Sequence, residues 1–300
     1  MDNNTQKNLQ QQSLLLTHLE LLLVVTIWAG TFISTKYVLL EIPPALSALY
    51  RYGIASLILL VIDYKNPETI RPSDYGRITF LGATGVTLYY LLQHYGINYT
   101  NATDASILIS LSPVFIACIS WTLLKERVKP ATILGLVLAL AGCILVITNG
   151  DITIKNNQGR WWGDLLILLT AVSWALYSVY GKKILAAYTI RTIVKYTTWA
   201  GTVLLIPFSL PEMAGVEHAS LSWTGWLNLF YLGGLASVYG YLAWYRALAK
   251  LPSVTVGSYL YFRPFLAGLM AAVVLHERIS GYIIAGGLLI IAGTYLSVKK

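Results

Sequence analysis

Arg263 is the charged residue that lies deepest in an apolar segment of this sequence. It belongs to the stretch YLYFRPFLAG, residues 259–268, and a proline follows it directly. An arginine near the centre of a bilayer costs about 2.5–3.5 kcal/mol on insertion scales, so it needs a wet cavity or a partner. A guanidinium can hold a carboxylate or a phosphate through two parallel hydrogen bonds. We therefore expect Arg263 to bind an anionic group of a substrate, and a buried structural ion pair is the alternative.

Aromatic and polar residues accompany this arginine at helical spacing. Residues three or four positions apart share one face of a helix, which places Tyr259 beside Arg263 and groups the side chains of residues 90–94 and of residues 241–245. Walls of this kind are typical of pockets for small organic molecules. Singly, each aromatic residue could instead serve packing or the membrane interface. The candidate substrate-binding residues are Arg263, Tyr259, Tyr90, His94, Gln93, Tyr241, Trp244, Tyr245, Trp28, Trp174 and Ser110.

Two prolines lie at mid-segment positions. Pro113 and Pro264 each remove a backbone hydrogen bond and free the carbonyl four residues earlier, that of Ile109 and that of Leu260. Transporters expose backbone to their substrates at such broken helices near the middle of the membrane. We expect both prolines to act as hinges, with a simple packing kink as the alternative.

The elements that carry these residues are apolar helices. The 300 residues are 56% hydrophobic and 11% charged, whereas about 25% of the residues of a soluble protein are charged. Only helices or closed barrels satisfy their backbone groups in lipid, and the lengths here fit helices. Residues 1–16, which are polar and rich in glutamine, are expected to be a disordered cytoplasmic tail. The expected spans are residues 17–38, 43–64, 75–97, 101–124, 130–149, 161–182, 189–209, 223–248, 253–275 and 279–297.

The basic residues gather in alternate gaps between these spans. The net charge of +8 would suit nucleic acid, but this distribution instead follows the rule that cytoplasmic loops of membrane proteins are rich in Lys and Arg. We therefore expect no nucleic-acid partner. The pattern predicts a multi-pass protein of the cytoplasmic (plasma) membrane with both termini in the cytoplasm. Arg51 lies less deep than Arg263, and Glu41 is its expected partner.

The chain is an internal duplication. An alignment of the chain with itself matches Pro113 with Pro264, Arg263 with Ser112, Glu126 with Glu277, Gly142 with Gly293 and Trp28 with Trp174. Gly135, Gly142, Gly286 and Gly293 are expected to serve close packing of helices. Each copy has five spans, an odd number, so the copies must lie in opposite orientations. We expect repeats over residues 17–149 and 161–300, joined by an external linker over 150–160. Inverted repeats are typical of alternating-access transporters, with the substrate site between the halves.

Several motifs in this duplicated set resemble a known family. The first span contains WAGTFISTK, residues 28–36, and the second contains the pair Arg51-Tyr52. The stretch SPVFIACISWTLLKERVKPATILGLVLALAG, residues 112–142, has its second copy in FRPFLAGLMAAVVLHERISGYIIAGGLLIIAG, residues 262–293. These motifs resemble the drug/metabolite transporter superfamily, in particular its EamA-type ten-helix exporters, although Ala29 replaces a usual glycine. The resemblance implies a central cavity among spans 1, 3, 4, 6, 8 and 9, and export of small metabolites, often amino acids.

The function that these features favour is a secondary transporter that exports amino acids or related metabolites by alternating access. A multidrug exporter of hydrophobic cations is disfavoured by the buried positive charge of Arg263, and a non-transporting membrane scaffold by the paired prolines. The sequence shows no phosphate-binding loop, metal cluster or nucleophile triad, so we expect no enzymatic activity, no metal and no cofactor. Expected partners are a small-molecule substrate, either an amino acid or an organic anion, and membrane lipid. The expected assembly is a monomer or a homodimer.

Overall fold

The computed structural model describes residues 3–65, 68–99, 102–151, 160–213, 221–274 and 280–298, and every regular element in these ranges is helical. The first part contains α1 (Asn3–Leu39), α2 (Pro44–Ile62), η1 (Pro72–Asp74), α3 (Tyr75–Gly82), the π-helical η2 (Ala83–Leu88), α4 (Tyr89–Tyr99), α5 (Ala102–Ile109), α6 (Ser112–Leu123) and α7 (Pro130–Thr148). The second part contains α8 (Arg160–Ile184), α9 (Ile190–Met213), α10 (Trp223–Phe230), the π-helical η4 (Tyr231–Tyr239), α11 (Gly240–Lys250), α12 (Ser253–Ser258), the 3-10 turn η5 (Tyr259–Tyr261), α13 (Phe262–Val274) and α14 (Gly281–Val298). The predicted all-helical fold is confirmed for these residues.

Seven of the described helices are long and apolar enough to cross a membrane. They cover Gln12–Leu39, Pro44–Ile62, Ala105–Leu123, Pro130–Thr148, Trp161–Ile184, Ile190–Met213 and Gly281–Val298. The expected spans 75–97, 223–248 and 253–275 are not among these seven, and a π-helical or 3-10 segment divides each of them into shorter pieces.

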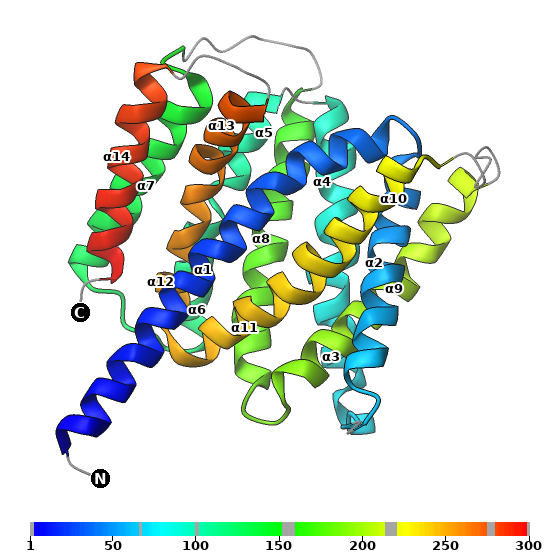
Figure 1. Cartoon of the computed structure of the whole chain (residues 1–300), viewed down its shortest axis with the longest axis horizontal. Coiled ribbons are helices and arrows are strands. Elements are labelled where there is room, and N and C mark those ends of the chain that lie inside the picture. The colour runs from blue at the N-terminus through cyan, green and yellow to red at the C-terminus, as the bar shows by residue number, and fades with distance from the viewer. Residues whose placement is uncertain are drawn as a thin grey trace.

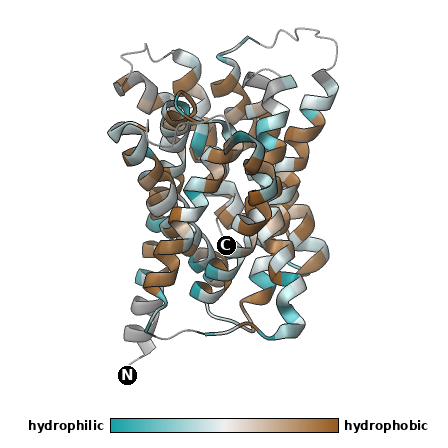
Figure 2. Ribbon diagram, turned by 90° about the vertical axis from the view of Figure 1, so that its right-hand side faces the viewer, coloured by the Kyte–Doolittle hydropathy of each residue, from teal (hydrophilic) through white to brown (hydrophobic). Residues whose placement is uncertain are grey.

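The outer surface of the bundle is apolar. Hydrophobic residues lie along the sides of the helices over most of their length (Figure 2). Leu57, Val61 and Leu288 expose 65%, 75% and 63% of their surface. Exposed apolar surface of this extent marks contact with a partner or a membrane, and the helices are long enough for the second.

The start of the chain differs from the prediction. Residues 3–16, expected to form a disordered tail, belong to α1, which begins at Asn3 and projects beyond the other helices (Figure 1). The reason lies in the composition, because glutamine and leucine are good helix formers and no glycine or proline interrupts them. A polar sequence therefore did not indicate disorder here.

The helix bundle has two opposite ends. The lower end in Figure 1, where α2 and α11 finish and where α9 and α12 begin, is called the base. The opposite end is called the top. The segment from α3 to α4 runs from base to top, whereas the segment from α10 to α11 runs from top to base (Figure 1). The alignment of the chain with itself places η2 opposite η4, so both segments are π-helical at corresponding positions.

Helices α7 and α14 pair closely along one side of the bundle. A Cβ atom added to Gly135 would lie 2.5 Å from the carbonyl oxygen of Gly293, and one added to Gly142 would lie 2.6 Å from that of Gly286. Small residues let two backbones approach in this way. The close helix packing predicted for these four glycines is confirmed.

The two helices that carry the predicted hinges are broken near their prolines. Helix α5 ends at Ile109 and α6 begins at Ser112, so that Pro113 is the second residue of α6. Helix α12 gives way to η5 before α13 begins, and Pro264 is the third residue of α13. A proline is tolerated in the first turn of a helix, where its missing N–H has no partner to lose. The breaks therefore follow from the sequence at both positions.

Candidate functional site

A cavity of about 430 Å³ lies among α4, α5, α8 and α13. Pockets for small organic molecules measure about 300–1,000 Å³. Polar groups reach it from Gln93, Ser106, Ser110 and Ser112, but most of its wall is apolar. Ile147 at the end of α7 and Ile283 at the start of α14 also line it. Because both of these positions lie at the top of their helices, this main cavity extends towards the top.

A second, small cavity of about 30 Å³ adjoins the first. Its wall consists of Trp28, Thr31, Arg51, Tyr89, Tyr90, Trp174, Tyr241 and Arg263. Tyr89, Trp174 and Arg263 line both cavities. These three side chains therefore stand between a large apolar space and a small space bordered by two guanidinium groups.

Arg263 projects from the first turn of α13. Its guanidinium carbon lies 6.0 Å from the centre of the Trp28 ring, within the range of a cation–π contact. Ser112, its counterpart in the sequence repeat, lines the main cavity as well. The broken helices of the two halves thus meet at this cavity, one with a hydroxyl and the other with a cation.

Arg51 is a buried cation on α2. Its Nε donates a hydrogen bond to Ser237 Oγ at 2.8 Å, and its guanidinium carbon lies 5.0 Å from the centre of the Tyr90 ring. The predicted pairing with Glu41 is wrong. The Glu41 carboxylate instead accepts a hydrogen bond from the backbone N–H of Ser222 at 2.8 Å, where it satisfies a free N–H group at the start of α10.

The π-helical segments supply backbone acceptors to aromatic side chains. Trp28 Nε1 donates to the carbonyl oxygen of Ala236 in η4 at 2.9 Å, and the Tyr241 hydroxyl donates to that of Gly85 in η2 at 3.1 Å. Irregular helical turns leave carbonyls available in this way. The Trp174 ring lies 5.3 Å from the Trp28 ring, edge to face, but its buried Nε1–H has no hydrogen-bond partner among the described residues.

The structure brings most of the predicted substrate-binding residues together. Those that line one or both cavities are Trp28, Tyr90, Gln93, Ser110, Trp174, Tyr241 and Arg263, together with the predicted hinge Pro264. Those that do not appear among the described lining residues are His94, Trp244, Tyr245, Tyr259 and the hinge Pro113.

Trp244 and Tyr245 of α11 are fully buried between helices and are not among the lining residues of either cavity. Trp244 Nε1 donates to Ser178 Oγ at 3.1 Å, and the Tyr245 hydroxyl donates to the carbonyl oxygen of Tyr177 at 3.0 Å. Because both partners belong to α8, these two side chains join α11 to α8. Their spacing from Tyr241 correctly predicted a shared face of the helix, but α8 covers the part of that face nearer the base.

His94 and Tyr259 also contact other residues instead of lining a cavity. His94 Nδ1 lies 2.8 Å from the carbonyl oxygen of Tyr90, one turn earlier in the same helix. The Tyr259 hydroxyl lies 2.8 Å from Nδ1 of His18 on α1. Each is thus held by a local or interhelical contact.

Several residues of the cavity walls were not predicted as site residues. Thr31, Arg51, Tyr89 and Ser112 are among them. Arg51 carried a detectable signal, because a charge inside an apolar span is costly wherever it lies. Tyr89 carried none, since its neighbour Tyr90 lies about 100° away around an ideal helix and the sequence does not say which of the two faces inward.

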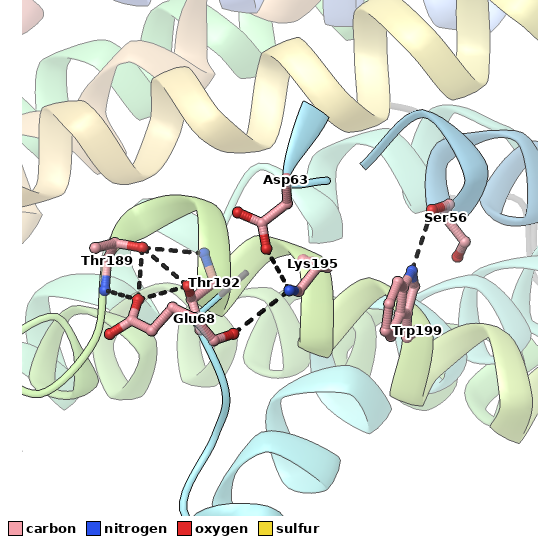
Figure 3. Close-up of polar contacts among 7 residues, drawn as sticks. All are labelled: Ser56, Asp63, Glu68, Thr189, Thr192, Lys195 and Trp199. Carbon is pink, nitrogen blue, oxygen red and sulfur yellow. Dashed lines mark hydrogen bonds and ion pairs between the residues drawn. The ribbon is translucent and has the colours of Figure 1, made fainter. Parts of the chain in front are cut away.

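The cations at the base are arranged differently from those of the cavities. Lys195 of α9 forms an ion pair with Asp63 at the end of α2, and both side chains are less than a tenth exposed (Figure 3). Lys182 of α8 lies 2.8 Å from the carboxylate of Glu126, which also accepts a hydrogen bond from the backbone N–H of Ser253 at 2.8 Å. We call these two contacts the base ion pairs.

A third carboxylate at the base holds the start of α9. Glu68 accepts hydrogen bonds from the hydroxyls of Thr189 at 2.8 Å and Thr192 at 2.6 Å (Figure 3). Burial alone would raise the pKa of Glu68, but the hydrogen bonds from Thr192 and Thr189 outweigh it and the pKa lies below its ordinary value. The carboxylate is therefore held in its charged form.

The geometry suits the binding of a small organic molecule. The described residues contain no cluster of three or more His, Cys, Asp or Glu side chains that could hold a metal ion. Glu277 and Arg278 of the second motif, and most of the expected linker over 150–160, lie outside the described residues.

Comparison with known proteins identifies the family. The sequence model of the EamA-like transporter family matches residues 15–148 and again residues 161–299. An uncharacterized transporter of Archaeoglobus fulgidus is 36% identical over 95% of this chain and 98% of its own length. A probable terminal-alkyne amino-acid exporter of Streptantibioticus cattleyicolor is 32% identical over 93% of this chain and 92% of its own. A solved crystal structure shares the fold, with a TM-score of 0.80 and 18% identity over 93% of this chain and 95% of that one.

Proposed function

The chain belongs to the EamA-like transporter family, and we propose that it exports amino acids or related anionic metabolites across the cytoplasmic membrane by alternating access. The matches are to transporters rather than to enzymes, as the sequence predicted.

The proposed architecture is ten membrane-spanning helices in two inverted repeats of five. The double match of the family to residues 15–148 and 161–299 supports the duplication. The corresponding π-helical segments η2 and η4, which run in opposite directions, support the inversion (Figure 1). On this view the three divided spans cross the membrane as interrupted helices, which transporters use to build substrate sites.

The observation that carries the proposed function is the position of Arg263 in the wall of the main cavity. A cation beside a mostly apolar space selects a molecule with an anionic group and an apolar body. The names of two relatives agree with this class: the Streptantibioticus protein is a probable amino-acid exporter, and a 26% identical protein of Salmonella typhimurium is a probable amino-acid metabolite efflux pump.

The structure fits an outward-facing state if the base is cytoplasmic, as the distribution of basic residues predicts. The main cavity extends towards the top. Towards the base, the fully buried side chains of Tyr177, Trp244 and Tyr245 fill the interior. The Lys182–Glu126 pair and the bond from Ser253 N–H join α8, the loop after α6 and the start of α12 below them.

The test is counterflow in proteoliposomes. Vesicles preloaded with one unlabelled compound are mixed with the same compound in labelled form, over a panel of amino acids, organic anions and cationic drugs, with protein-free vesicles as the control. We expect labelled amino acids or organic anions to accumulate transiently. Accumulation of cationic drugs alone would show that the protein is a cation exporter, and accumulation of nothing in the panel would refute the proposed function.

A further inference from the structure

We propose that the small cavity is a carboxylate-binding subsite formed by Arg51, Arg263 and the indole N–H of Trp174, and that the substrate is an organic acid whose apolar body lies in the main cavity. This inference rests on the proposed function, since it assigns the substrate class of the same site. The structure supports it through charge, hydrogen bonding and size.

The first support is the balance of charge. Two guanidinium groups border the small cavity, and the described lining residues of both cavities include no Asp or Glu. The polar partner of Arg51 is the neutral hydroxyl of Ser237. Cations held close together in a medium of low dielectric constant repel one another strongly, and an anion between them relieves that cost.

The second support is the orphaned indole of Trp174. The repeat pairs Trp174 with Trp28, whose N–H is satisfied by the carbonyl of Ala236 in η4. The corresponding carbonyl in η2, that of Gly85, is already engaged by the Tyr241 hydroxyl. The Trp174 Nε1–H is therefore buried without a partner among the described residues, in a side chain 6% exposed. A buried donor without an acceptor is costly, and a substrate carboxylate would supply the acceptor.

The third support is the size of the two spaces. A cavity needs about 10–15 Å³ to hold one water molecule, so the small cavity of about 30 Å³ has room for a carboxylate group and not for an entire metabolite. The main cavity of about 430 Å³ has room for the rest, and Ile109, Leu260 and Ala267 give it an apolar wall. Arg263 and Trp174 border both spaces, so a molecule that lies across them would present its carboxylate to the small cavity.

The experiment measures binding to the purified protein in detergent by isothermal titration calorimetry. The probes are 3-phenylpropanoate, 3-phenylpropanamide and 3-phenylpropylamine, which share one apolar body and differ in the head group, with propanoate and benzoate to vary the body. A hydrogen-bonded charge is worth about 1.5–3 kcal/mol, which is about 10–100-fold in affinity. We expect a carboxylate to bind about 10–100-fold more tightly than its amide. We also expect this preference to fall below about threefold in Arg51→Gln and to be intermediate in Arg51→Lys.

Two matched controls separate the subsite from general effects on the fold. Trp174→Phe removes the orphaned N–H, whereas Trp244→Phe removes an N–H that is bound to Ser178 outside both cavities. Arg246→Gln removes an arginine that also lies over a tyrosine ring but is paired with Glu20. We expect Trp174→Phe to weaken carboxylate binding, and Trp244→Phe and Arg246→Gln to leave the preference for carboxylate intact.

Two results would overturn the inference. One is an undiminished carboxylate preference in Arg51→Gln and Trp174→Phe proteins that remain monodisperse and helical. The other is the absence of carboxylate-dependent binding across all the acids tested, while counterflow shows transport of other compounds. The second result would leave the transport function standing without this subsite. A protein that moves nothing in the counterflow panel would instead refute the proposed function itself.

Discussion

Buried cations have carboxylate partners at the base but not among the described lining residues of the small cavity. At the base, Lys195 is paired with Asp63 and Lys182 with Glu126, so each cation has a carboxylate from another part of the chain. In the small cavity, Arg51 is satisfied by a hydroxyl and by tyrosine rings, and no described lining residue is acidic. The base contains the counter-ions of its cations, whereas the small cavity is a space in which a counter-ion could bind beside Arg51.

This difference separates charges that hold the helices from charges that are available to a ligand. A buried ion pair joins two elements, and the loss of one partner leaves an uncompensated charge. Arg51, in contrast, contacts a neutral hydroxyl and tyrosine rings and borders a cavity, so it does not join two helices through an ion pair. Substitutions at the base should therefore mainly lower the stability of the protein, and substitutions at the cavity should mainly change substrate binding and transport.

Lys195→Met should have the largest effect, on stability. It leaves Asp63 buried without its partner, which costs about 3–5 kcal/mol, so we expect a large loss of thermal stability in detergent. The double variant Lys195→Met/Asp63→Leu removes both charges and should recover most of that loss. Equal stabilities of the single and double variants, measured by thermal unfolding, would show that the two charges are not coupled.

Arg263→Ala should have the next largest effect, on transport. Loss of a charge-assisted contact of about 1.5–3 kcal/mol lowers the transport of an anionic substrate by about 10–100-fold. Thermal stability should change much less than in Lys195→Met. Arg263→Lys keeps the charge without the two-pronged geometry and should transport at an intermediate rate. If both variants are expressed normally and transport at the wild-type rate, Arg263 does not contribute to substrate binding.

Glu126→Gln should lower the stability of the protein by less than Lys195→Met does. Lys182 and Glu126 are 21% and 17% exposed, so solvent screens their attraction more than that of the Lys195–Asp63 pair. We expect a loss of about 1 kcal/mol, with similar losses in Lys182→Met and in the double variant because all three lack the same pair. Additive losses, measured in a double-mutant cycle by thermal unfolding, would mean that the two residues act independently.

Glu68 should produce the smallest effect, and one that depends on pH. Its folded pKa lies below the ordinary value of 4.5, so its stabilising contribution is complete above pH 4.5 and is lost as the pH falls through the lower folded value. Glu68→Gln should remove that part of the acid sensitivity, which is small because the side chain is partly exposed. Parallel pH profiles of thermal stability for the wild type and Glu68→Gln would rule out a contribution from this carboxylate.

Several features were predictable because they depend on local sequence. Apolar length located the helices, and the prolines located the breaks beside Ser112 and Arg263. The glycines of α7 and α14 predicted a close pair of helices. The position of Arg263 in a cavity wall also agrees with the prediction, since a charge at that depth needs a polar environment.

Other features depend on which helix covers which. Spacing placed Tyr241, Trp244 and Tyr245 on one face of α11, but only the contact with α8 decided that Trp244 and Tyr245 are buried between helices while Tyr241 borders the small cavity. Likewise, Glu41 lies near Arg51 along the chain, yet its carboxylate accepts a hydrogen bond from the backbone N–H of Ser222 at the start of α10.

The sequence by itself determined the helical class, the duplication and the positions of the breaks, because hydrophobic length and proline act on the chain locally. The tertiary structure alone decided that Arg51 and Arg263 share one small cavity with the free N–H of Trp174. These residues come from α2, α13 and α8, and no spacing along the chain relates side chains whose distance is set by the packing of three separate helices.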